Sequence, residues 1–205
     1  MQKFLFSALW MILLLSACNQ KAARLETIET TDRDGYIERY SRRTTDYAKE
    51  GLYVRTDPRG TKVEEAEYRN DTLNGRRTLY YETGDLQVVE TYRMGLFDGA
   101  YEVYYPGGQV KLAGQYTANV MSGIWRGYYA NGQLKEEVTF ADNAENGPFT
   151  EYHPNGQLKA VGTYLNGDNE HGELKLYDEN GQHEKTMLCD KGTCRTVWSS
   201  EKQED

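Results

Sequence analysis

The chain has 205 residues, with 24 Lys and Arg against 32 Asp and Glu, so its formal net charge at pH 7 is −8. This negative charge disfavours binding to nucleic acid and to anionic lipid head groups. The length suits one domain, and 17 tyrosines favour half-buried strands over a large dry core.

The first segment has the layout of a cleaved export signal. Lys3 precedes an apolar run, from Phe4 to Leu15, that is too short to cross a bilayer as a permanent helix. The run ends in Leu15-Ser16-Ala17-Cys18, which resembles the bacterial lipobox, whereas the alternative is a secreted protein with an incidental cysteine. The resemblance implies that residues 1–17 are a lipoprotein signal peptide and that Cys18 is acylated, with palmitate among the expected chains.

An acylated cysteine would be a durable membrane anchor, because several acyl chains act together. Asn19 follows the cysteine. By resemblance to lipoproteins of this kind, this residue implies the bacterial outer membrane, and both periplasmic and cell-surface exposure stay open. Residues 18–34 are predicted to be the acylated Cys18 followed by a polar tether.

A partial N-terminal copy of a repeat is predicted at residues 35–50. The segment from Gly35 to Tyr40 has the spacing of the first strand of later copies, without a matching turn glycine. Such a half-copy would cover an open sheet edge.

Two series of glycines run through the rest of the chain with a period of 24 residues, and 25 at the last step. The first series starts the copies and consists of Gly51, Gly75, Gly99, Gly123, Gly147 and Gly172. The second series follows nine residues later and consists of Gly60, Gly84, Gly108, Gly132, Gly156 and Gly181. A fixed period predicts an elongated array of small units that bury their apolar sides against one another.

Each copy has the pattern of a β-hairpin. In the copy starting at Gly123, two strand-like stretches meet at Asn131-Gly132, the pair that best suits a two-residue type I′ turn. The fold class is therefore predicted as all-β, an elongated single antiparallel sheet of stacked hairpins over residues 35–198. Glu136 interrupts the apolar side of its strand, and tyrosines such as Tyr128 are expected to carry the cohesion between copies.

The C-terminal copy carries two cysteines, Cys189 and Cys194, which would lie in an oxidising compartment. We predict a disulfide across a hairpin, within a C-terminal cap at residues 185–198. A metal site would need further ligands, and a redox motif normally has the tighter Cys-x-x-Cys spacing. Residues 199–205 are predicted to form a flexible acidic tail.

Several stretches resemble a known family. Tyr128-Tyr129-Ala130-Asn131-Gly132-Gln133-Leu134 and Asn146-Gly147-Pro148-Phe149-Thr150-Glu151-Tyr152 are similar to the MORN repeat variant of bacterial proteins, including proteins labelled as YwqK-family antitoxins. The resemblance covers about residues 35–189. It implies a sheet of stacked hairpins used for protein interaction or membrane-proximal scaffolding, with no catalytic residues. An exported, anchored chain is poorly placed to act as an antitoxin against a cytoplasmic toxin.

The residues themselves also favour a non-enzymatic protein without cofactor or metal. His153 occupies an aromatic slot, His171 precedes a repeat glycine, and His183 occupies an apolar slot, so no catalytic arrangement joins them. The oxygen-rich loops 142–146 and 166–171 match no calcium-loop spacing and are predicted to be solvated turns.

Two binding hypotheses remain. The favoured one is a scaffold, tethered to the membrane by its lipid, that binds another envelope protein or outer-membrane complex through exposed aromatics. The alternative is a glycan- or peptidoglycan-binding module in which sugar rings stack on those aromatics. The candidate binding residues are Tyr105, Trp125 and Tyr129, and the competing interpretation is that such rings only pack the repeats together.

Overall fold

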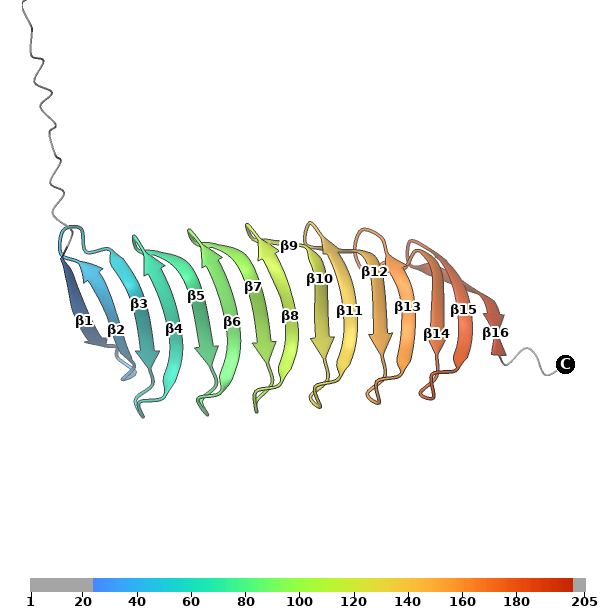
Figure 1. The fold of residues 1–205 in the computed structure, drawn as a ribbon, viewed down its shortest axis with the longest axis horizontal. Coiled ribbons are helices and arrows are strands. Elements are labelled where there is room, and N and C mark those ends of the chain that lie inside the picture. Colours follow the sequence, from blue (N-terminus) through green and yellow to red (C-terminus); the bar gives the residue numbers. More distant parts are fainter. Residues whose placement is uncertain (1–23, 201–205) are drawn as a thin grey trace, which may run out of the picture.

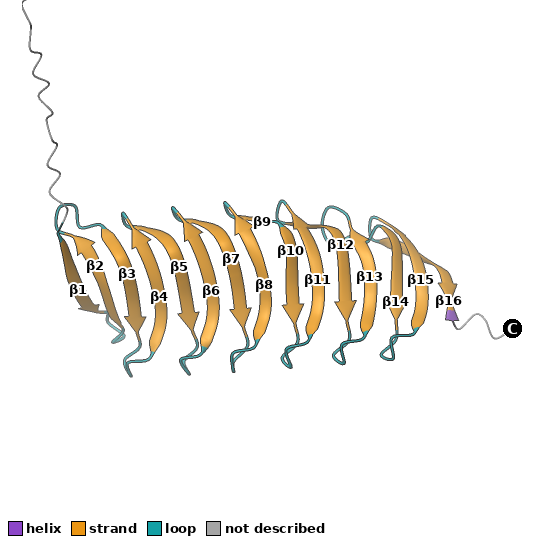
Figure 2. Cartoon of the chain, viewed as in Figure 1, coloured by secondary structure: helices purple, strands orange, loops and turns teal. Residues whose placement is uncertain are grey.

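The computed structural model describes residues 24–200, which form one elongated, single-layered antiparallel sheet (Figure 1). The strands lie side by side in chain order, and only the short β9 is off this path, paired with β8. Strands occupy most of the described chain and short loops join them (Figure 2). The predicted fold class is confirmed. The strands are β1 (Leu25–Thr31), β2 (Ile37–Arg43), β3 (Lys49–Thr56), β4 (Lys62–Arg69), β5 (Thr72–Tyr80), β6 (Leu86–Arg93), β7 (Leu96–Tyr104), β8 (Val110–Thr117), β9 (Val120–Met121), β10 (Gly123–Tyr128), β11 (Leu134–Ala141), β12 (Ala144–Tyr152), β13 (Leu158–Tyr164), β14 (Gly172–Tyr177), β15 (His183–Asp190) and β16 (Thr193–Ser199).

The array starts earlier than the sequence pattern indicated. The prediction of a tether over residues 18–34 is wrong for its described part, because β1 lies in that range and pairs with β2 along its whole length. Gly35 is a turn glycine, since its N–H donates to the carbonyl of Asp32 just as that of Gly60 donates to Asp57. The predicted partial copy at 35–50 is therefore a complete N-terminal hairpin, β1–β2.

The turns at the lower edge of the sheet in Figure 1 differ from the prediction. In the turn at Tyr129, its N–H donates to the carbonyl of Gln133, and the N–H of Gly132 donates back to the carbonyl of Tyr129. Only the glycine has a positive φ, +85°. This is a three-residue loop with a glycine bulge, so the predicted two-residue type I′ turn at Asn131-Gly132 is wrong.

Two-residue loops with the conformation of type I′ turns occur at the opposite, upper edge, where one hairpin joins the next. Both central residues have positive φ there, as this turn type requires. These pairs are Asn70-Asp71, Met94-Gly95, Ala118-Asn119, Asp142-Asn143 and Lys191-Gly192. Each second residue also donates its N–H to a carbonyl of the preceding copy, for example Asn119 to Phe97 at 2.9 Å. The upper edge is therefore held by a ladder between copies.

Several glycines of the first series, among them Gly75, Gly99 and Gly147, lie at β-bulges. The pairing between β6 and β7 shifts between Glu90 and Tyr92, at the point where Gly99 has a φ of +133°. A Cβ atom on Gly99 would lie 2.8 Å from Cγ2 of Thr91. Only glycine fits this conformation and this close approach. Gly75 and Gly147 repeat it, with φ of +129° and +131°, whereas Gly123 and Gly172 have φ of +71° and +80° and open space where a Cβ would lie.

One face of the sheet, here called the core face, carries a row of large side chains paired with small ones. Trp125 lies opposite Val138 in register, and Phe149 lies opposite Gly162. Gly114, which belongs to neither glycine series, lies where a Cβ would approach Cδ2 of Trp125 to 2.1 Å. The alternation lets flat rings lie directly on the backbone of the neighbouring strand.

The aromatic residues that pack together are not those predicted. Trp125 contacts Tyr101, Tyr116 and Phe140, with ring centroids 5.2–5.9 Å apart. By contrast, no ring pair in residues 24–200 involves Tyr128. Ring cohesion between copies therefore comes from the row on the core face, and its assignment to Tyr128 is wrong. Of the equivalents of Tyr128, Tyr177 packs on His183 within one hairpin, with ring centroids 5.4 Å apart.

The C-terminal end closes with the hairpin β15–β16. Ser199, predicted to belong to the flexible tail, is buried at the end of β16, and residues 201–205 lie outside the described part. Trp198 stacks on His183 with ring centroids 4.4 Å apart. Within residues 24–200, no helix has the length and apolarity needed to span a membrane.

Candidate functional site

The core face is the candidate site because charged side chains, such as Arg77 and Glu136, interrupt its row of large apolar side chains. Trp125, one of the predicted binding residues, lies at its centre and is only 3% exposed. Its ring is covered by neighbouring aromatic rings and lies against Gly114. The prediction that Trp125 offers its ring face to a ligand is therefore wrong.

The other two predicted binding residues make hydrogen bonds that link one copy to the next. The hydroxyl of Tyr105 donates to the carbonyl of Tyr128 at 2.9 Å, and that of Tyr129 donates to the carbonyl of Tyr152 at 2.8 Å. Both rings are half-buried. Because these hydroxyls satisfy backbone carbonyls, Tyr105 and Tyr129 hold hairpins together, in keeping with the interpretation that such rings pack the repeats.

The histidines are explained by their places in the array. His153 occupies the position that Tyr105 and Tyr129 have in earlier copies. It makes the equivalent contact to the next copy, with Nε2 2.9 Å from the carbonyl oxygen of Tyr177. His171 lies beside Asp190 at the C-terminal end, with Nδ1 and Oδ1 3.4 Å apart. Across residues 24–200, no group of three or more His, Cys, Asp and Glu side chains is arranged to hold a metal ion.

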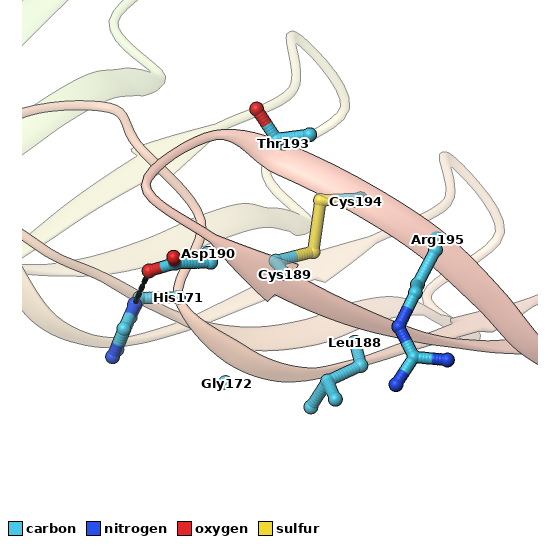
Figure 3. A pocket seen from close by; sticks show the side chains of 8 residues that line it. All are labelled: His171, Gly172, Leu188, Cys189, Asp190, Thr193, Cys194 and Arg195. Atoms are coloured by element: carbon cyan, nitrogen blue, oxygen red, sulfur yellow. Dashed lines mark ion pairs between the residues drawn. A yellow bond between two sulfur atoms is a disulfide. The ribbon is translucent and has the colours of Figure 1, made fainter.

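The predicted disulfide between Cys189 and Cys194 is present and joins β15 to β16 beside the two-residue loop. Figure 3 shows it within an open hollow of about 630 Å³ whose rim carries the His171–Asp190 pair. The disulfide replaces the ring that earlier copies place at the position of Cys189. The predicted lipidation residue Cys18 lies outside the described residues.

A partly buried charge network occupies the core face at β4, β5 and β6. Arg77 takes the slot of the large ring, with Nε 2.7 Å from a carboxylate oxygen of Glu64 and Nη1 3.0 Å from one of Glu90. The hydroxyl of Tyr92 donates to Glu90 at 3.1 Å, and burial together with the Glu90 charge raises the pKa of Tyr92 to about 12. Arg77 thus joins the two carboxylates that flank it, so this network is internally satisfied.

A second polar group lies on the same face at β8–β12, and the sequence pattern indicates only part of it. A hollow of about 230 Å³ is walled by Trp125, Phe140 and other apolar residues, and it contains the carboxylates of Glu136 and Glu145. We call it the acidic hollow; its residues are Leu112, Met121, Trp125, Gly127, Glu136, Val138, Phe140 and Glu145. The signal in the sequence is the interruption of an apolar slot, which occurs at Glu136 and equally at Glu145.

The comparisons with known proteins support the repeat architecture. A family model described as the MORN repeat variant matches residues 73–94, 97–118, 121–142, 145–166 and 170–188. Together these segments cover just over half of the 205 residues. Each segment corresponds to one hairpin with its lower-edge turn, and the two N-terminal hairpins of the sheet precede the first of them. No curated protein matched the chain.

Proposed function

This chain belongs to the MORN repeat variant family, and from this premise we propose that it is a non-enzymatic scaffold that holds another protein at the bacterial cell envelope. In this proposal the chain is a lipoprotein of the outer membrane, anchored by acyl chains on Cys18. Its sheet then presents the core face to a protein partner.

The observation that carries the proposal is the open core face of a single-layered sheet. In a β-sandwich a second sheet would cover such a face, whereas the described residues form only one sheet. The side chains on the face vary along the array, from Arg77 through Trp125 to Glu151. A long surface with changing chemistry suits recognition of an extended partner.

The position of the first strand supports an anchor close to the sheet. The chain enters β1 at the upper edge, where the carbonyl of Arg24 accepts the N–H of Thr44. Residues 19–24 are all that separates Cys18 from β1. At a maximum of about 3.5 Å per residue, the first hairpin would stay within roughly 20 Å of the lipid anchor.

The anchor is tested by replacing Cys18 with alanine and growing cells with an alkyne analogue of palmitate. We expect the unchanged chain to take up the label and to sediment with outer membranes, and Cys18→Ala to be unlabelled and soluble. A variant with both Cys189 and Cys194 replaced by serine is the control and should keep the label. Label on Cys18→Ala, or an unlabelled parent chain, would refute the anchor.

The scaffold is tested by site-specific photo-crosslinking in intact cells. A photoreactive phenylalanine at Glu151 lies on the core face, and the same residue at Arg126 lies on the back face. We expect a discrete heterologous product from Glu151 that is absent from Arg126. Equal products from both faces, or recovery of the bait alone from both, would contradict a partner held on the core face.

A further inference from the structure

We propose that the acidic hollow binds a lysine or arginine side chain presented by the protein partner. The inference rests on the proposed scaffold function and names the chemistry of its recognition. It follows from four features of β8–β12 and the loop before β14: residues that depart from the repeat pattern, carboxylates that outnumber the nearby cations, an aromatic wall and a small volume.

The first feature is a change of residue type at one repeated slot, two residues before the first glycine of each copy. Leu73, Phe97 and Met121 fill this slot in three successive copies, and the next two copies have Glu145 and Glu170. In register each slot lies opposite a ring of the previous strand, as Phe97 lies opposite Tyr92 and Glu145 lies opposite Phe140. The two glutamates therefore place a charged carboxylate where the earlier copies pack an apolar side chain.

Glu136 and Glu151 add two further carboxylates on the same face. They lie directly opposite each other in the pairing of β11 with β12. Like charges in this arrangement destabilise a sheet. The equivalent slots in the β6–β7 pairing hold Val88 and Val103, also opposite each other. The Glu136–Glu151 pair is therefore an unfavourable pair of like charges. The equivalent pairs in the two preceding repeats, Leu112 with Gly127 and Val88 with Val103, are uncharged.

The cations in this region do not balance the carboxylates. Nζ of Lys135 lies 3.3 Å from Glu136, and Nζ of Lys159 lies 2.7 Å from Glu151. Within residues 24–200, neither Glu145 nor Glu170 has an ion-pair partner. The hollow therefore has an excess of negative charge.

Burial and the carboxylates of this region raise the pKa values of neighbouring acidic groups. Burial, followed by the charges of Asp168 and Glu136, raises the pKa of Glu145. Burial and the nearby carboxylates, with Glu151 first among them, raise the pKa of Tyr164 to about 12. A cation placed in the hollow would relieve this repulsion.

The walls and the size select the kind of cation. The half-buried ring of Phe140 lines the hollow next to the buried Trp125, with the two ring centroids 5.9 Å apart. A half-buried ring suits the apolar stem and charged head of a basic side chain. Gly127 leaves room, since a Cβ there would lie 2.6 Å from Oε1 of Glu136. The volume of about 230 Å³ is below the roughly 300–1,000 Å³ of small-molecule sites and suits a single side chain.

The test is a titration followed by NMR on the full mature chain, with ¹⁵N-labelled tryptophan, in mild detergent. The probes are N-acetyl-lysine methylamide and its uncharged norleucine counterpart. We expect the lysine probe to shift the indole N–H signal of Trp125 in a saturable way. The signal of Trp198, at the C-terminal end of the sheet, is the internal control and should not move.

Glu145→Gln should weaken binding of the lysine probe roughly fivefold or more, the effect of losing one partly buried ion pair. Glu137→Gln is the matched control, because Glu137 is the neighbour of Glu136 on the back face, where it pairs with Arg126 at 2.8 Å. That variant should bind like the parent chain. Equal shifts with the norleucine probe, equal loss in both variants, or no saturable shift would overturn the inference.

The outcomes separate this inference from the scaffold proposal. A crosslinked partner whose yield is unchanged by Glu145→Gln, combined with no response to the lysine probe, refutes the acidic hollow alone. A saturable lysine response without any crosslinked partner refutes the scaffold and leaves the hollow as a cation site.

Discussion

At the scale of single residues, the core face depends on the absence of side chains as much as on their presence. Trp125 can lie flat only because Gly114 on the neighbouring strand has no Cβ. Gly162 does the same for Phe149, since a Cβ there would lie 2.7 Å from that ring. These two glycines lie on the strand next to a large ring, at the position that the ring covers. They belong to neither of the two glycine series.

Gly114→Ala should therefore be strongly destabilising. The added Cβ would lie 2.1 Å from Cδ2 of Trp125, and overpacking of this kind costs about 1–3 kcal/mol. We expect a lower midpoint in thermal unfolding and an altered near-UV tryptophan spectrum. Gln115→Ala, at the next residue on the back face, is the control. A Gly114→Ala protein that melts with the parent would show that the ring does not rest on this backbone.

Glu145→Gln should stabilise the fold at neutral pH. The raised pKa of Glu145 means that folding favours its protonated form, so this contribution is present below the unfolded pKa and is lost as the pH rises through the folded value. Glutamine imitates the protonated state at every pH. We expect thermal melts of the variant to be higher than those of the parent at pH 7, with the difference disappearing near pH 4. A variant that is less stable at pH 7 would contradict the repulsion in the acidic hollow.

At the scale of the hairpin, two ladders join each unit to the next. The lower-edge ladder uses side-chain rungs, such as Tyr129 to the carbonyl of Tyr152 at 2.8 Å. The upper-edge ladder uses loop backbone and asparagine side chains, such as the N–H of Met121 donating to Oδ1 of Asn143 at 2.8 Å. A hairpin alone is marginally stable, so these rungs and the shared rings supply the stability of the array.

Tyr129→Phe removes one rung and keeps its ring. The carbonyl of Tyr152 then loses the hydroxyl that bonds to it, and we expect a loss of about 1 kcal/mol. Hydrogen exchange should rise mainly in β10–β13, on the two sides of the missing bond. Tyr47→Phe, at a ring that is 64% exposed, should leave both stability and exchange unchanged. Equal effects of the two variants would mean that the hydroxyl is not a rung.

At the scale of the whole molecule, the ribbon is not equally strong along its length. β12 and β13 share six register pairs, whereas β13 and β14 share two, Ala160 with Leu176 and Val161 with Lys175, followed by one isolated bridge between Tyr164 and Glu170. β8 and β10 also share two register pairs, but the short β9 adds two more to β8. A longer loop, residues 165–171, accompanies this weak seam. Beyond it, β14 pairs with β15 at six register positions, and the Cys189–Cys194 disulfide joins β15 to β16.

This seam predicts opening of the C-terminal end as a unit. In native-state hydrogen exchange we expect β14–β16 to exchange together and faster than β11–β13, because an array loses structure where nearest neighbours bind least. Reduction of the disulfide should speed exchange further in β15 and β16 alone. A single exchange class for all of β11–β16 would contradict the seam.

The sequence by itself determined the features that recur in every copy. The period of the glycines, the alternation along each strand and the spacing of the cysteines predicted a single antiparallel sheet of hairpins and the disulfide, because these features depend on local geometry that recurs in every copy. The excess charge of the acidic hollow was visible only as Glu136, one interruption in an apolar stripe.

The tertiary structure decided what lies across neighbouring strands. Only the register shows that Gly114 supports Trp125 and that Glu136 faces Glu151. It also shows that Tyr105 and Tyr129 bond to the next hairpin, and that the chain before Gly35 forms a strand. Each of these contacts joins residues from different strands, and which residues meet depends on bulges and loop types. The spacing of residues along one strand does not determine that.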